Sequence, residues 1–380
     1  MERTSIGLVL TGGGARGAYQ AGALLAIAEI TGARRIPFGV VAGASAGALS
    51  AAYLVARARE FRPASRGLAD LWSTLLPRSV FRTDTATIVK TAGEWSADLG
   101  LGGLIGTGRG KALLDTSPLR ELVTKSLDVR ALRRNLRLGV VHGLAVTATS
   151  YRTGLGITFF EGAQSIQPWS RVTRIGTRAE IGIDHVMASS AIPLFFPAVC
   201  VDGEWYSDGC IRLSTPLSPA IHLGARRILA ISVRSAGQPE ERAARETPAY
   251  PTAAETGGVL LDAIFLDALE SDVERVTRIN ETLGLVSPEA RARRATRLER
   301  VDVLVLRPSV DLASLVLTTV DRFPAPVRHL FRGLGASETG GWDLLSYLAF
   351  DGIYTTRLLD LGYEDTVARA DEIRAFLGAR

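Results

Sequence analysis

The stretch that decides the fold reads Val40-Val41-Ala42-Gly43-Ala44-Ser45-Ala46-Gly47-Ala48-Leu49. It predicts a buried strand, a sharp turn that carries Ser45, and a helix of small residues. Gly43, Ser45 and Gly47 fit the G-x-S-x-G pattern of a nucleophile elbow, in which a serine stands on a strained strand-to-helix turn. The two glycines leave out Cβ atoms that would collide where the chain enters and leaves the turn. The following helix would direct its N-terminal N–H groups toward negative charge formed beside the serine. The alternative is an ordinary serine in a turn of small residues.

A glycine-rich loop precedes this elbow and also joins a strand to a helix. The apolar run Ile6–Leu10 predicts a buried strand, the loop is Gly12-Gly13-Gly14-Ala15-Arg16-Gly17, and 18–30 has the spacing of a helix. N–H groups without side chains crowd together in such a loop, which can bind an anion or an oxyanion. The loop also satisfies the dinucleotide fingerprint, but that interpretation needs an acidic residue at the end of the next strand. That strand ends in Gly43 and Ser45, so an oxyanion hole for Ser45 explains both loops together.

Composition restricts the classes of protein that the chain can belong to. Of its 380 residues, 47% are hydrophobic, which is ample for a large core, and the net charge of +5 is mildly basic. Nucleic-acid binding would require basic residues clustered with aromatic residues, whereas the one short basic cluster, 291–300, has none. We interpret that cluster as a solvated helix face, with contact to anionic lipid as the alternative. The N-terminal apolar run is too short for a signal peptide, and no run could span a membrane. The expected location is cytoplasmic, with any membrane contact peripheral.

The middle of the chain predicts a candidate cap and a second group of strands. Residues 61–135 read as helical and irregular, and form either a cap over the site or a plain structural insertion. Within them, 106–112 resembles a P-loop but has the wrong spacing and Ala112 at the magnesium-ligand position. Leu136–Ala148 reads as a central strand, and a turn at Thr153-Gly154 leads to its hairpin partner, 156–160.

An apolar segment at 188–197 and an Asp-Gly pair at 208–209 follow. The segment contains two prolines and cannot form a long helix. We interpret it as a mixture of core and acyl-chain wall, with substrate contacts expected from Pro193, Phe195 and Phe196. An Asp-Gly turn at 202–203 would place Cys200 opposite Trp205 and not opposite Cys210, so we expect no disulfide.

The last third of the chain predicts one more strand among helices. Arg226–Val233 reads as a buried strand, Val259–Ile279 as one amphipathic helix, Val301–Pro308 as a late strand, and Leu344 to the end as helical. Strands that alternate with helices imply a mostly parallel sheet covered on both faces. We therefore expect a catalytic unit at 1–235 and a mainly helical extension at 236–380, whose strand at 301–308 rejoins the core.

Four stretches together, in their order along the chain, resemble the patatin-like phospholipase family. They are the glycine loop at 12–17, the elbow at 43–47, the segment 188–197, and Asp208-Gly209. The resemblance implies a three-layer α/β/α fold and the hydrolysis of phospholipid or other fatty-acyl esters without a metal or cofactor.

The same resemblance assigns roles to individual residues. It implies Ser45 as the nucleophile and Asp208 as the base of a Ser–Asp dyad. It also implies an oxyanion hole made by the N–H groups of Gly13 and Gly14, with Gly12 shaping the loop and Arg16 nearby. The chain departs from the family pattern at Cys210, where glycine or alanine is usual.

One other catalytic arrangement and two other functions stay open at this point. A Ser-His-Asp triad would need His222 or His329, which we expect to be structural. A nucleotide-dependent enzyme would use the 12–17 loop and should bind nicotinamide or flavin cofactors. A catalytically silent, membrane-associated or regulatory protein would keep the fold without ester turnover. The sequence leaves head-group preference and oligomeric state undetermined.

Overall fold

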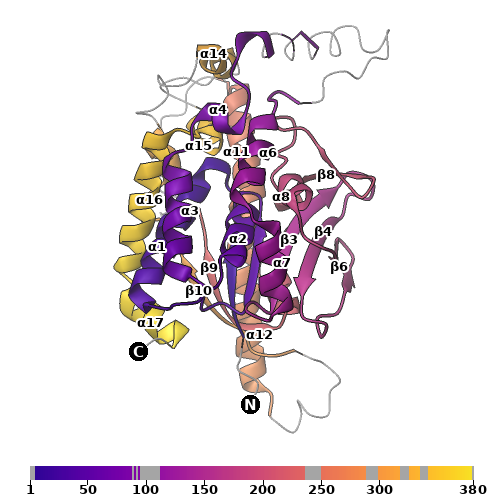
Figure 1. Cartoon of the computed structure of the whole chain (residues 1–380), viewed down its shortest axis with the longest axis vertical. Coiled ribbons are helices and arrows are strands. Elements are labelled where there is room, and N and C mark those ends of the chain that lie inside the picture. Colours follow the sequence, from indigo (N-terminus) through magenta and orange to yellow (C-terminus); the bar gives the residue numbers. More distant parts are fainter. Residues whose placement is uncertain are drawn as a thin grey trace.

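The computed structural model describes residues 5–87, 90, 93–94, 112–235, 250–287, 298–316, 325–333 and 341–378. Nearly all of the P-loop-like stretch at 106–112 and most of the basic cluster at 291–300 lie outside these residues. Figure 1 shows a central sheet with helices packed on both of its faces, and two helices of the last third, α16 and α17, lying against the first helix of the chain.

The strands form one mostly parallel sheet. Their order is β10-β9-β1-β2-β3-β4-β6-β5, with β8 paired to β3 and β7 paired to β8. The pairs from β10 to β3 are all parallel, whereas β4 and β8 each run antiparallel to β3. The strands are β1 (Ser5–Leu10), β2 (Val40–Ala44), β3 (Gly143–Ser150), β4 (Gly156–Gly162), β5 (Trp169–Arg171), β6 (Arg174–Arg178), β7 (Val199–Val201), β8 (Glu204–Asp208), β9 (Ala225–Ile231) and β10 (Asp302–Leu306).

Helices cover the sheet on both faces and supply most of the core. The α-helices are α1 (Ala18–Thr31), α2 (Ala46–Ala56), α3 (Phe61–Ser73), α4 (Pro77–Val80), α6 (Ser117–Ser126), α7 (Val129–Arg137), α8 (Ile183–Ser189), α9 (Ser218–His222), α11 (Ala253–Phe265), α12 (Asp267–Leu285), α14 (Ala325–Gly333), α15 (Trp342–Leu348), α16 (Gly352–Val367) and α17 (Ala370–Leu377). Short 3-10 helices include η1 (Gly14–Gly17) and η2 (Gly209–Ile211).

Alternation along the strands divides the core into two clusters, one on each face of the sheet. Leu8 and Leu10 of β1 belong to the larger cluster, with α1, α2, α3 and α16, whereas Val9 belongs to the smaller one, with α9 and α12. Successive strand residues point to opposite faces, so a sheet buried on both sides needs apolar residues at every position. The predicted three-layer α/β/α architecture is confirmed.

Two predicted element boundaries were wrong. Residues 136–142 do not belong to the central strand, because α7 continues to Arg137 and β3 begins at Gly143. The side chain of Asp128 caps α7 by accepting a hydrogen bond from the N–H of Ala131, which makes the helix stronger than its apolar spacing suggests. The amphipathic stretch at 259–279 is two helices, α11 and α12, that meet at Leu266.

The hairpin of β7 and β8 has the predicted register. Asp202 and Gly203 both adopt positive φ, at 49° and 83°, as a tight two-residue turn requires. Cys200 therefore lies opposite Trp205, and both cysteines are free. This register places the C-terminal end of β8, which carries Asp208, beside β3.

Candidate active site

Ser45 stands on the turn between β2 and α2 in a strained backbone conformation. Its φ of 54° and ψ of −129° are rare for a residue with a side chain, and such strain costs about 1–3 kcal/mol. A Cβ on Gly43 would lie 2.3 Å from the carbonyl oxygen of Gly47, and one on Gly47 would lie 2.2 Å from the carbonyl oxygen of Leu10. A side chain at either glycine would therefore force the turn open.

Two serines from the end of α8 hold this strained turn. The N–H of Ser45 donates to Oγ of Ser189 (3.0 Å), which in turn donates to the carbonyl oxygen of Thr147 (2.6 Å). Oγ of Ser190 donates to the carbonyl oxygen of Ser45 (3.2 Å). Sequence reasoning assigned no such role to this pair, because nothing in the local pattern distinguishes it from core-packing serines.

Asp208 is the last residue of β8 and is fully buried. Its pairing with Ala148 of β3 places it near β2, the strand that ends at the elbow. The main-chain oxygen of Asp208 accepts a hydrogen bond from Oγ1 of Thr149 (2.8 Å), and its N–H donates to the carbonyl oxygen of Ala191 (2.8 Å). Both the N–H and the carbonyl group of Asp208 are thus hydrogen-bonded, which fixes the backbone that carries the carboxylate.

The environment of this carboxylate makes it a stronger base than an ordinary aspartate. Burial raises the pKa of Asp208 to about 6, and the side chain of Ser45 is the neighbour that opposes this rise most. The Oδ1 atom accepts a hydrogen bond from the N–H of Cys210 (2.9 Å), whereas Oδ2 has no hydrogen bond of normal geometry to any described residue. One carboxylate oxygen is therefore fixed by the backbone of Cys210, and the other has no such bond.

The glycine loop lies directly against this pair of residues. A Cβ on Gly12 would lie 2.9 Å from Cβ of Ser45 and 2.3 Å from Sγ of Cys210, so only glycine allows the approach. The N–H groups of Gly13 and Gly14 donate to no group among the described residues. Together they can receive negative charge close to Ser45, which is what an oxyanion hole requires.

The side chain of Arg16, which we expected near the oxyanion hole, binds residues of α11 and α15. It is only 1% exposed, and its guanidinium donates to Oγ of Ser346 (2.7 Å), the hydroxyl of Tyr347 (3.1 Å) and Oδ1 of Asp262 (3.3 Å), with Asp343 at 3.5 Å. All these partners belong to α11 and α15. The guanidinium binds these partners because a buried cation needs anions and hydrogen-bond acceptors around it.

An apolar pocket opens beside Ser45, with about 490 Å³ of empty space that includes its opening to solvent. Phe196 is the only one of the three predicted substrate contacts that lines this pocket, and Ile192 from the same segment lines it too. The N–H of Phe196 donates to the carbonyl oxygen of Ile192 (2.7 Å) around Leu194, whose φ is 67°. This turn brings Ile192 and Phe196 to the pocket, whereas Pro193 and Phe195 do not line it.

Half of the residues that line the pocket lie outside the motifs that sequence reasoning singled out. The candidate cap region 61–135 supplies a large share through α3, α4 and α6, and the C-terminal region supplies one residue. The wall residues from these parts are Leu71, Trp72, Leu75, Val80, Leu119, Leu122 and Phe350. Their only sequence signal is apolar spacing, which core residues share.

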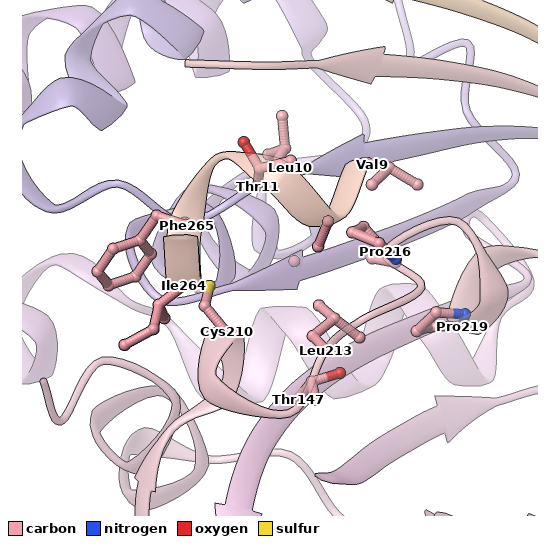
Figure 2. A pocket seen from close by; sticks show the side chains of 14 residues that line it. Val9, Leu10, Thr11, Thr147, Cys210, Leu213, Pro216, Pro219, Ile264 and Phe265 are labelled. Atoms are coloured by element: carbon pink, nitrogen blue, oxygen red, sulfur yellow. The ribbon is translucent and has the colours of Figure 1, made fainter. Parts of the chain in front are cut away.

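A second pocket, shown in Figure 2, lies on the other side of the glycine loop and has about 390 Å³ of empty space. Cys210 extends into it toward Ile264 and Phe265 of α11. Burial and the neighbouring Asp208 raise the pKa of this thiol, and the N–H of Gly12 is hydrogen-bonded to it. The cysteine that departs from the family pattern thus fills space between the glycine loop and Asp208.

The two histidines that a triad would need lie elsewhere. His222 stacks on Trp169 with ring centroids 4.4 Å apart, and burial, with Arg171 and Arg174 nearby, lowers its pKa to about 4. His329 belongs to α14 and does not line the pocket beside Ser45. A histidine with so low a pKa is a poor proton acceptor near neutral pH.

These features define a three-layer α/β/α protein with a serine elbow, a buried aspartate and a glycine loop at one site. A family model described as patatin-like phospholipase matches residues 8–221, which is more than half of the chain. The chain therefore belongs to the patatin-like phospholipase family, and it carries that family's lipid-hydrolase domain. Among curated proteins, none matches this sequence.

Several solved structures are similar in fold. VipD from Legionella pneumophila is 14% identical over 97% of this chain and 67% of its own, with a TM-score of 0.36. Human GIVD cytosolic phospholipase A2 in complex with a fluorophosphonate inhibitor is 14% identical over 99% of this chain and 60% of its own (TM-score 0.42). A chain of the SpcU–ExoU complex from Pseudomonas aeruginosa is 17% identical over 98% and 80%, respectively (TM-score 0.27). Because these TM-scores are below 0.5, the family model alone carries the assignment.

Proposed function

We propose that the protein is a serine hydrolase that cleaves fatty-acyl esters through Ser45 and Asp208. The observation that carries the proposal is a buried carboxylate, with one oxygen free of normal hydrogen bonds, beside a serine on a strained elbow. Serine nucleophiles need an adjacent base, and a base works best when its pKa lies near the working pH. The raised pKa of Asp208 supports this role.

The reaction would proceed in two steps. Oγ of Ser45 attacks the ester carbonyl carbon while Asp208 takes the hydroxyl proton, and the negative charge on the carbonyl oxygen is received by the N–H groups of Gly13 and Gly14. The tetrahedral intermediate then collapses, and the leaving alcohol receives the proton from Asp208. Water attacks the acyl-enzyme, gives a proton to Asp208, and releases the fatty acid as Ser45 regains its proton. In measured cases, each oxyanion donor stabilises the transition state by about 3–4 kcal/mol.

The pocket supports an acyl chain as the group that is bound. Most of its walls are aliphatic and aromatic side chains, and Ser45 is among the residues that line it. We infer a phospholipid or another fatty-acyl ester as substrate, with α3, α4 and α6 as a cap over the chain. Access to such a substrate would involve peripheral contact with a lipid surface. Within the described residues, no helix has both the length and the apolar character needed to cross a membrane.

Labelling with a fluorophosphonate probe, followed by peptide mapping, tests the proposal. We expect one adduct per chain at Ser45, lost in Ser45→Ala and strongly slowed in Asp208→Asn. Ser65→Ala is the matched control, since Ser65 is a buried serine of α3 that does not line the pocket. A folded protein that stays unlabelled in the presence and absence of lipid vesicles would be a silent member of the family.

A further inference from the structure

The glycine loop is enclosed by helices that lie outside the residues matched by the family model. A Cβ on Gly14 would lie 2.1 Å from the carbonyl oxygen of Tyr347 in α15, and one on Gly12 would lie 2.9 Å from the ring of Phe265 in α11. The rings of Phe265 and Tyr347 lie 5.1 Å apart and form one surface behind the loop. The loop is therefore packed between Ser45 on one side and the two helices on the other.

Arg16 connects this loop to both helices through a buried network. The hydroxyl of Tyr347 accepts a hydrogen bond from Nη1 of Arg16 (3.1 Å) and donates one to Oδ1 of Asp262 (2.7 Å), so it links α15 to α11. Oγ of Ser346 accepts from Nε of Arg16 (2.7 Å). The guanidinium also lies 4.0 Å from the centre of the Tyr347 ring, where a cation is attracted to the π system.

The energetics of burial make this network rigid. A guanidinium that is 1% exposed has lost its hydration, and only its full set of partners offsets that loss. Burial by itself lowers the pKa of Arg16, but Tyr347 and Asp262, with smaller contributions from Tyr354 and Asp343, raise it above its ordinary value, so the charge persists. Any shift of the loop away from α11 and α15 would leave a buried charge without its partners.

The network acts on the same turn that presents the candidate oxyanion donors. The N–H of Arg16 donates to the carbonyl oxygen of Gly13 (3.1 Å), and this bond closes the turn. The first N–H groups of the turn, those of Gly13 and Gly14, have no partner among the described residues. Oxyanion donors stabilise the transition state only when they are held in place before the reaction, because their reorientation would cost free energy. A rigid anchor on Arg16 meets this requirement.

We propose that Arg16, Asp262, Ser346 and Tyr347 are positioning residues that hold the Gly13 and Gly14 N–H groups where the oxyanion forms. The inference rests on the proposed function and extends it: the active site includes α11 and α15 from the C-terminal part of the chain. Arg16 would act through the backbone, without contact to the substrate.

The test compares Tyr347→Phe and Ser346→Ala, singly and together, in the full chain. Replacement of Arg16 itself risks misfolding, whereas these variants remove hydrogen bonds and little volume. Tyr363→Phe is the matched control, since its hydroxyl donates to Glu29 (2.7 Å) and links α16 to α1 away from the loop. Two readouts are needed: kcat and KM on a soluble p-nitrophenyl ester well below the melting temperature, and hydrogen exchange of the peptide that contains residues 12–17.

We expect the double variant to lose about tenfold in kcat at unchanged KM, less than the roughly 100-fold or greater loss of a whole oxyanion donor. Its 12–17 peptide should exchange faster, while the apparent pKa of the pH–rate profile stays that of the wild type. Tyr363→Phe should change neither readout. Unchanged kcat and unchanged exchange at 12–17 would overturn the inference, as would a lower melting temperature alone. If the wild type itself turned over no ester, the proposed function would fail, and unaltered exchange in the variants would still separately refute the anchoring of the loop.

Discussion

Replacing Asp208 by asparagine should abolish ester turnover and at the same time stabilise the folded protein at alkaline pH. The fold holds this carboxylate fully buried, where the charged form is disfavoured. Asparagine has nearly the same shape, and its oxygen can still accept the hydrogen bond from the N–H of Cys210 (2.9 Å in the wild type). The substitution therefore removes a buried charge without removing its main contact.

The magnitude follows from the shift in pKa. Burial raises the pKa of Asp208 from 3.8 to about 6. The folded state thus binds the proton more tightly than the unfolded state, so the free energy of unfolding falls as pH rises from about 4 to about 6 and then stays low. A rise of roughly 2 units in the pKa of Asp208 lowers the free energy of unfolding by about 3 kcal/mol above pH 7. At pH 5 the loss is roughly half as large. For a chain of this size we expect a gain in melting temperature of about 5 °C at pH 8.

Thermal unfolding of both proteins at pH 5 and pH 8 measures this gain. The matched control is Asp360→Asn, the same chemical change at an exposed position of α16. The advantage of Asp208→Asn should roughly double between the two pH values, whereas the control should show no such trend. An Asp208→Asn protein that is less stable than the wild type at pH 8, or whose advantage does not depend on pH, would refute the reasoning.

Three further expectations concern activity. The kcat/KM for a soluble ester should rise with pH and level off above about 6, because the proposed base, Asp208, accepts a proton only in its ionised form; a flat pH–rate profile from pH 5 to 8 would contradict that role. Gly14→Ala should lower kcat at least tenfold, since its Cβ would meet a carbonyl oxygen 2.1 Å away, whereas Gly32→Ala, also at positive φ but with nothing within 4 Å, should leave kcat unchanged. Leu122→Trp should reduce turnover of long-chain esters more than that of short-chain esters, because it fills the pocket beside Ser45; equal losses on a chain-length series would place the acyl chain elsewhere.

The elements that sequence reasoning placed correctly are those whose structure depends on nearby residues. The elbow at Gly43–Gly47 and the turn at Asp202-Gly203 both need backbone conformations that few residues adopt, so their glycines are visible in the sequence. The apolar runs within β1, β2 and β9 were equally visible, because the part of a strand that is buried on both faces is apolar at every position. The boundary between α7 and β3 was misplaced because apolar residues serve both a helix face and a buried strand.

The amino-acid sequence by itself therefore determined the three-layer fold and the meeting of the glycine loop and Asp208 with Ser45, since short motifs carry these residues. Only the tertiary structure decided what Arg16 does, which side of 188–197 faces the pocket, and how Ser189 and Ser190 hold the elbow. Arg16 and Tyr347 are separated by 331 positions along the chain. A side chain's partners at such separations follow from how the helices pack on the sheet, and packing leaves no periodicity or spacing that a single sequence displays.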